Sequence, residues 1–137
     1  MAEAILRKRL DELGRKDVDV RSAGVRALNG LPPSDETIEV MKEGGVDVSS
    51  FRTKNITADM VRNADLILTM ETAHKNEILT IMPEAGSKTY LLKEYKNPGA
   101  FSSKGPNIDD PIGKPVEEYR IVRDEIKKEI ERFAGEL

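Results

Sequence analysis

Apolar positions recur along this chain at two spacings, which predict helices that alternate with short strands. Steps of three and four residues are typical of a helix with one buried face. They are found in five segments, the first followed by a glycine and the second opened by a serine: residues 2–13, 34–44, 57–61, 72–82 and 116–133. In the last segment Tyr119 and Phe133 fall on the apolar face, so we expect both in the core.

Three segments between these helices have the pattern of strands: residues 18–20, 65–70 and 88–92. Val18 and Val20 alternate with charged residues, which indicates a half-buried strand. Residues 65–70 contain a continuous apolar run, which is typical of a strand covered on both faces of a parallel sheet. Strands separated by helices predict an α/β fold with a mainly parallel sheet. No linker or repeat divides the sequence, so residues 1–137 are expected to form one domain.

Composition and charge narrow the classes of function. The chain has 137 residues, of which 38% are hydrophobic and 34% charged, as expected for a soluble globular domain. Its net charge of −3 gives no basic footprint for nucleic acid. The sequence shows neither an apolar run of membrane-spanning length nor a signal-peptide pattern, so we expect no membrane partner and a cytoplasmic location. The lack of cysteine excludes disulfides, thiolate metal sites and a cysteine nucleophile within this chain.

The stretch 107–113 is the strongest candidate for chemistry. Asp109 and Asp110 are adjacent carboxylates in a loop with Pro111 behind them and Gly113 beyond. Because a proline restricts the residue before it to extended conformations, Asp110 is expected to present its carboxyl group in a defined pose. Such a group suits proton transfer to a leaving group. The competing interpretation is an acidic, solvated turn that caps the next helix.

Two other arrangements are weaker. A serine-hydrolase triad of Ser22, His74 and Asp110 would need a G-x-S-x-G elbow around Ser22, and the sequence lacks one. A magnesium or calcium site of Asp109, Asp110 and Glu117 fits no known loop motif. We therefore expect neither a metal nor a cofactor.

Four motifs, in this order, resemble the low-molecular-weight protein tyrosine phosphatase family, whose relatives include bacterial protein-arginine phosphatases and some arsenate reductases. They are Met1-Ala2-Glu3-Ala4 at the first helix, Arg21-Ser22-Ala23-Gly24, Ala64-Asp65-Leu66-Ile67-Leu68-Thr69-Met70 followed by His74, and Asp110-Pro111 with Gly113 ahead of Tyr119. Together they span nearly the whole chain. The resemblance implies a three-layer, phosphotyrosine phosphatase I-like α/β fold, with helices on both faces of the parallel sheet.

The resemblance also implies roles for individual residues. Asp110 matches the family's general acid, which protonates the leaving oxygen and later activates the hydrolytic water. Ser22 and His74 match positions that brace the phosphate loop through hydrogen bonds. The alternative for His74 is an ordinary helix histidine satisfied by its neighbours. Ile112 takes the rim position where the family often has an aromatic residue beside the substrate ring, which weakens the case for phosphotyrosine.

One part of the family pattern has no counterpart here. Family members begin with a strand that leads into a C-x5-R loop, and the resemblance starts just after it, so we expect a domain truncated at its N-terminus. In the family that strand lies at the centre of the sheet. We therefore expect either direct pairing of residues 18–20 with residues 65–70, or a homodimer in which a second chain fills the gap.

The resulting function prediction is a phosphatase-family domain. The complete protein would hydrolyse phosphomonoesters on phosphotyrosine or phosphoarginine in a protein, or in a small phosphate ester, through a cysteinyl-phosphate. The chain as given would be inactive, since it lacks the nucleophile and the phosphate loop. The alternatives are a non-catalytic relative that binds or oligomerises, and a family member of the arsenate reductase type.

Overall fold

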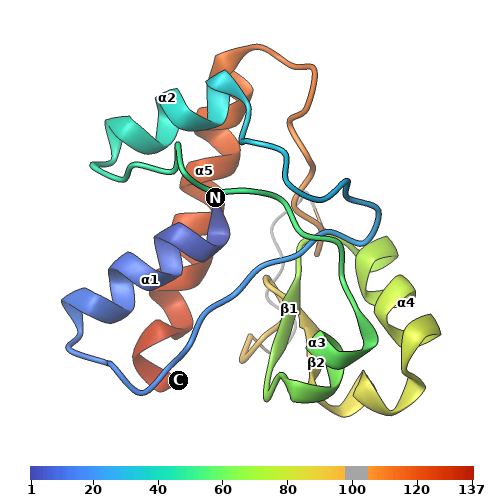
Figure 1. Cartoon of the computed structure of the whole chain (residues 1–137). Coiled ribbons are helices and arrows are strands. Elements are labelled where there is room, and N and C mark those ends of the chain that lie inside the picture. Colours follow the sequence, from blue (N-terminus) through green and yellow to red (C-terminus); the bar gives the residue numbers. More distant parts are fainter. Residues whose placement is uncertain (98–104) are drawn as a thin grey trace.

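The computed structural model describes residues 1–97 and 105–137, in which helices surround a small parallel sheet (Figure 1). In chain order the elements are α1 (Ala2–Glu12), α2 (Asp35–Glu43), α3 (Ala58–Asn63), β1 (Ile67–Thr69), α4 (Thr72–Ile81), β2 (Thr89–Leu91) and α5 (Val116–Phe133). Two 3₁₀ helices, Pro83–Lys88 and Ala134–Glu136, follow α4 and α5. All five predicted helices are confirmed, as are two of the three predicted strands.

Local side-chain chemistry explains where two of the helices begin. The hydroxyl of Ser34 accepts a hydrogen bond from the Thr37 amide at 3.2 Å, and the hydroxyl of Thr57 accepts one from the Met60 amide at 3.2 Å. Each bond satisfies a backbone N–H that has no partner within the first turn of a helix. The sequence signals for the starts of α2 and α3 are therefore the caps themselves.

The sheet consists of β1 and β2 in parallel, with α4 between them in the sequence. Ile67 lies opposite Thr89, and Thr69 lies opposite Leu91. In Figure 1, α1 and α5 lie on one side of this pair and α3 and α4 on the other. The side chain of Leu68 accordingly packs against the α1–α5 core, and that of Ile67 against the core of α3 and α4. Helices cover both faces of the sheet.

α5 is the centre of the main core. Its apolar stripe is buried against α1 and against the segments that follow β1 and β2: Val122, Ile126, Ile130 and Phe133. The stripe continues at Tyr119, which packs with Val40 and Met41 of α2 in a neighbouring cluster. The prediction that Tyr119 and Phe133 are core residues is confirmed, since they are only 5% and 0% exposed.

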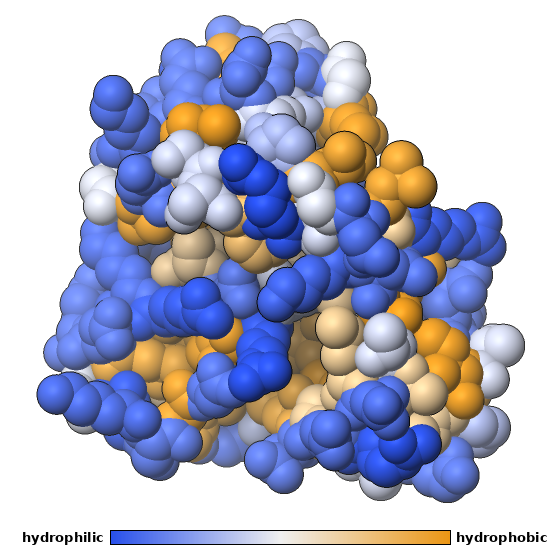
Figure 2. Space-filling view, viewed as in Figure 1, coloured by the Kyte–Doolittle hydropathy of each residue, from blue (hydrophilic) through white to orange (hydrophobic). Residues whose placement is uncertain are grey.

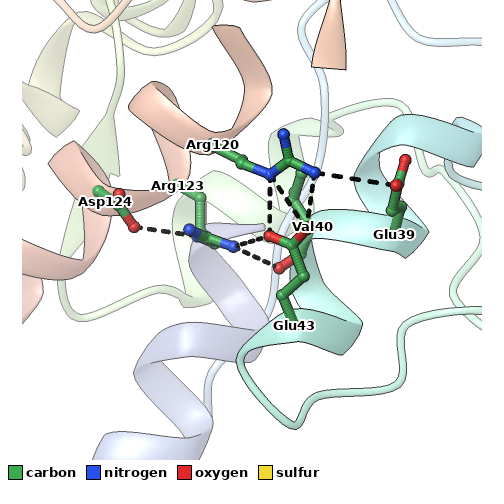
Figure 3. A network of polar contacts seen from close by, with 6 residues as sticks. All are labelled: Glu39, Val40, Glu43, Arg120, Arg123 and Asp124. Atoms are coloured by element: carbon green, nitrogen blue, oxygen red, sulfur yellow. Dashed lines mark hydrogen bonds and ion pairs between the residues drawn. The ribbon is translucent and has the colours of Figure 1, made fainter. Parts of the chain in front are cut away.

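Charged residues add a second link between α2 and α5 (Figure 3). The guanidinium of Arg120 donates to both oxygens of Glu43, over 2.8–3.1 Å. Arg123 donates to Glu43 at 2.6 Å and to the carbonyl of Val40 at 2.8 Å. These arginines hold the pKa of the Glu43 carboxyl below its ordinary value, Arg120 most strongly and Arg123 next.

The predicted strand at residues 18–20 is wrong, and so is its expected pairing with residues 65–70. The segment is extended but belongs to no strand. The Val20 carbonyl accepts instead from the Arg7 side chain of α1. Beyond it, Gly24 exchanges two backbone bonds of 2.8 Å with Lys54 and Ile56, in a parallel bridge. The segment is thus tied to α1 and to the chain ahead of α3.

β1 therefore has a strand neighbour on one edge only among the described residues. The apolar run that the sequence assigned to a fully covered strand is half-buried at Leu66, Ile67 and Leu68. The face of the molecule seen in Figure 2 is hollowed near its middle, with hydrophobic surface visible between hydrophilic side chains. No helix among the described residues is long and apolar enough to cross a membrane.

Candidate active site

The loop that carries Asp109 and Asp110 is fixed to the carboxyl end of β1 and the first turn of α4. The side-chain oxygen of Asn107 accepts from the Thr72 amide at 2.8 Å and from the Thr72 hydroxyl at 3.0 Å. The next residue, Ile108, donates its amide to the Met70 carbonyl at 2.9 Å. In parallel α/β sheets this edge is where ligands commonly bind.

Asp110 lies exposed between buried apolar neighbours. Ile108 is 2% exposed and Pro111 is also buried, so both ends of the Asp109-Asp110 pair are anchored. One carboxylate oxygen of Asp110 accepts from the Ile112 amide at 3.0 Å. This is the turn in which an aspartate bonds the backbone two residues on. α5 begins after Pro115 without a side-chain cap, so Asp110 is not the cap of that helix.

A shallow cavity of about 390 Å³ opens between this loop and α5. Its charged lining is mostly acidic: Asp109, Asp110, Glu118 and Glu125, with Lys114 on the loop. Its apolar lining comes from Pro111, Ile121 and Val122. The cavity is large enough for a small molecule.

A lysine that the sequence analysis did not identify lies behind the loop. Lys93 is 4% exposed, forms an ion pair with Glu125 of α5, and donates to the Gly105 carbonyl at 3.3 Å. It therefore joins the segment after β2, the start of the acidic loop and α5. No local pattern marks Lys93, because its partners lie at least twelve residues away in the sequence.

The other predicted site residues lie around this region without bonding to one another. His74 is in the first turn of α4, two residues after Thr72, and is half-buried. Ser22 is exposed in the extended segment after α1. Ile112 is 75% exposed at the tip of the loop. Within the described ranges no hydrogen bond or ion pair joins Ser22, His74 and Asp110.

The chemistry that this arrangement offers is that of a single exposed carboxyl group. Asp110 has one oxygen bonded to the backbone and the other without a hydrogen-bond partner in the described part of the chain, in an exposed position suited to proton transfer. No cysteine nucleophile accompanies it. Residues 1–97 and 105–137 hold no group of three or more His, Asp or Glu side chains that could bind a metal ion.

Comparison with known proteins identifies the family to which this chain belongs. The family model described as "Low molecular weight phosphotyrosine protein phosphatase" matches residues 1–137. A protein-arginine-phosphatase of Geobacillus stearothermophilus is 36% identical over 120 residues, which are 88% of this chain and 77% of that protein. Arsenate reductase 2 of Staphylococcus epidermidis is 35% identical over 115 residues, 83% of this chain and 72% of that protein.

A solved structure agrees with the sequence comparison. The crystal structure of a low molecular weight protein tyrosine phosphatase from T. tengcongensis superimposes with a TM-score of 0.88 at 34% identity. The match covers 99% of this chain and 88% of that one. The resemblance noted in the sequence and the α/β fold are thus confirmed. This chain belongs to the low molecular weight phosphotyrosine protein phosphatase family.

Proposed function

We propose that this chain is the acid-bearing scaffold of a phosphomonoesterase and that it is inactive without a nucleophile from outside residues 1–137. The observation that carries the proposal is the pose of Asp110, exposed at the carboxyl end of β1 with one oxygen bonded to the Ile112 amide. Family membership supplies the reaction class. The lack of cysteine supplies the second half of the proposal.

In this proposal Asp110 transfers protons. Its carboxylic acid donates a proton to the leaving atom, which is the phenol oxygen of phosphotyrosine or the guanidine nitrogen of phosphoarginine. The P–O or P–N bond breaks as phosphorus bonds to a cysteine thiolate of the complete protein. The resulting carboxylate then takes a proton from the water that attacks the cysteinyl-phosphate, and the thiolate is released with inorganic phosphate. General acid–base catalysis of this kind typically contributes about 10²–10⁴-fold to the rate.

Ser22 and His74 would brace the phosphate loop that follows the nucleophile. Ser22 is exposed and His74 has no side-chain hydrogen bond in the part of the chain that the structure describes, so both polar groups are available. Ile112 would contact the substrate at the rim, where its exposed aliphatic side chain offers no ring to stack on. The relatives act on different phosphorylated or oxyanion substrates, and we propose phosphotyrosine or phosphoarginine of a protein as the class for this one.

In this proposal the open edge of β1 receives a further strand. We propose that the complete three-layer fold has a central strand between β1 and the extended segment of residues 18–20, and that the catalytic loop follows it. The half-buried apolar side chains Leu66, Ile67 and Leu68 support this placement. A second copy of the chain is the alternative source of a strand. A purely non-catalytic, oligomerising relative is favoured by the missing cysteine alone.

Hydrolysis of p-nitrophenyl phosphate tests the proposal. The chain is compared with the same chain extended at its N-terminus by a family strand and C-x5-R loop, and with the extended Asp110→Asn variant. We expect no turnover by the chain alone, turnover by the extended chain, and a loss in the variant of at least about 10²-fold. A folded but silent extended chain would favour the non-catalytic relative, and turnover by the chain alone would show that another residue attacks phosphorus.

A further inference from the structure

We propose that Asn107 is a positioning residue that fixes Asp110 against the start of α4 for proton transfer. This inference rests on the proposed function. Asn107 itself is three residues before the carboxyl group, so it acts through the backbone of the loop and touches no reacting atom.

Asn107 takes the place of a side-chain cap that α4 lacks. Glu71 occupies the N-cap position of α4, and its side chain makes no capping hydrogen bond. The Thr72 amide instead donates to the side-chain oxygen of Asn107, which lies 35 residues further along the chain. The Thr72 hydroxyl donates to the same oxygen. One oxygen atom thus joins the acidic loop to the helix that carries His74.

The loop has little conformational freedom between Asn107 and the Asp110 carboxyl group. Ile108 is held by the hydrogen bond from its amide to the Met70 carbonyl and by the burial of its side chain. Pro111 is buried and has a fixed backbone torsion. Only Asp109 and Asp110 lie between these two anchors. Asn107 directly precedes Ile108, so its bonds to Thr72 set the direction in which the loop leaves the start of α4 and enters the short span that carries the Asp110 carboxyl group.

Asn107 is not needed for the fold itself. Thr72 is exposed, so water can take the place of Asn107 on its amide and hydroxyl when the side chain is removed. Ile108 keeps its place in the main core, so the loop remains attached. The fold therefore tolerates a change at Asn107, whereas a misplacement of about 1 Å at a reacting group can cost about 10²-fold in rate.

The test uses the extended chain and two substrates that differ in their need for an acid. The dinitrophenolate released from 2,4-dinitrophenyl phosphate leaves without a proton, whereas phenolate from phenyl phosphate needs one. Asn107→Leu removes the acceptor at similar size, and Asn107→Asp retains an acceptor oxygen. Asn76→Leu, at an exposed position of α4, is the matched control, and Asp110→Asn is the benchmark for a lost acid.

We expect Asn107→Leu to lower kcat/KM for phenyl phosphate by about tenfold or more while kcat/KM for 2,4-dinitrophenyl phosphate stays within about threefold. Asn107→Asp should restore the ratio of the two values, and Asn76→Leu should not change it. If the role of Asn107 were merely structural, Asn107→Leu would lower kcat/KM for both substrates together. The temperature of thermal unfolding should shift by only a few degrees in every variant.

Four outcomes would overturn the inference. One is that Asp110→Asn lowers the ratio of kcat/KM for phenyl phosphate to kcat/KM for 2,4-dinitrophenyl phosphate, whereas Asn107→Leu does not. Asp110 is then the acid, but Asn107 does not position it. If Asn107→Leu lowers kcat/KM for both substrates equally, the role of Asn107 is structural. If the extended chain is silent, or if Asp110→Asn leaves the ratio unchanged, the proposed function itself has failed and this inference with it.

Discussion

Lys93 lies in an environment that a lysine side chain rarely occupies. Its side chain is 5% exposed, and its ammonium group is compensated by Glu125 and by the carbonyl of Gly105. Breaking a fully buried pair by removing one partner costs about 3–5 kcal/mol, because the other charge stays desolvated. Here the remaining charge would be Glu125, which is 22% exposed and so partly hydrated.

We therefore expect Lys93→Met to lower the free energy of unfolding by about 2 kcal/mol, below the cost for a fully buried pair. The double variant with Glu125→Leu should recover most of this loss, since no unpaired charge remains. Urea unfolding of the four proteins in the double-mutant cycle measures both values. A double variant as unstable as the single one would mean that Lys93 acts by packing alone.

The Ser34 cap of α2 gives a second residue-scale prediction. Ser34→Ala removes the acceptor for the Thr37 amide and should cost about 1 kcal/mol of the free energy of unfolding. Ser50→Ala, at another exposed serine, is the matched control and should change it by less than about 0.5 kcal/mol. Equal losses in urea unfolding would show that the capping bond contributes nothing here.

These residues show what the sequence could and could not predict. The helix starts at Ser34 and Thr57 could be predicted, because each side chain caps the turn that it precedes and bonds to an amide three residues away. The defined pose of Asp110 could be predicted, because Pro111 restricts the backbone of the residue before it. Asn107 and Lys93 meet their partners only after the chain has folded back, so no local spacing could assign them a role.

At the scale of elements, Glu43 links α2 to α5 through two arginines, and this link depends on pH. Its pKa is lower in the folded chain than in the unfolded one, so the unfolded chain binds more protons in acid. The stabilisation is fully present above the ordinary pKa of glutamate, about 4.3, and is lost as the pH falls through the folded value.

Glu43→Gln should therefore be less stable than the parent chain at pH 7 and approach it as the pH is lowered below about 4. Thermal unfolding of both proteins between pH 7 and pH 3 measures the difference. Glu36→Gln, on the same helix, controls for the general effect of removing a carboxylate. A difference in unfolding temperature that stays constant across this range would exclude the ion pairs as its source.

The segment of residues 18–20 shows why an element can be predicted wrongly. The alternation of valine with charged residues is a genuine strand pattern, but a strand also requires a neighbouring edge. In this chain the Val20 carbonyl is bonded to Arg7, and Gly24 is bonded to the chain ahead of α3. Pattern predicts the extended backbone correctly and cannot predict whether a partner is present.

At the scale of the whole molecule, the open edge of β1 makes a measurable prediction. Thr69 faces β2 through the bond from the Leu92 amide, so in a parallel pair the amide of Leu68 faces the other way. Among the described residues nothing accepts from that amide. We expect Leu68 to exchange its amide hydrogen faster than Thr69, and to become protected by more than about tenfold in the extended chain.

Hydrogen exchange measured residue by residue by NMR, together with the molecular mass in solution, checks this prediction. Slow exchange of Leu68 in the chain alone would contradict an open edge. A dimeric mass at the same time would identify a second copy as the source of the pairing. A monomeric mass would mean that the edge is covered within the chain.

The pairing of α1 with α5 has a consequence for the order of folding. These helices lie at opposite ends of the chain, so their contact closes nearly its whole length, whereas β1, α4 and β2 are consecutive. Contacts between residues distant in sequence form late, because the entropy of the long loop is lost before they contribute. We expect the β1–α4–β2 unit to form first. In a newly synthesised chain, the main core can form only after α5 has been synthesised.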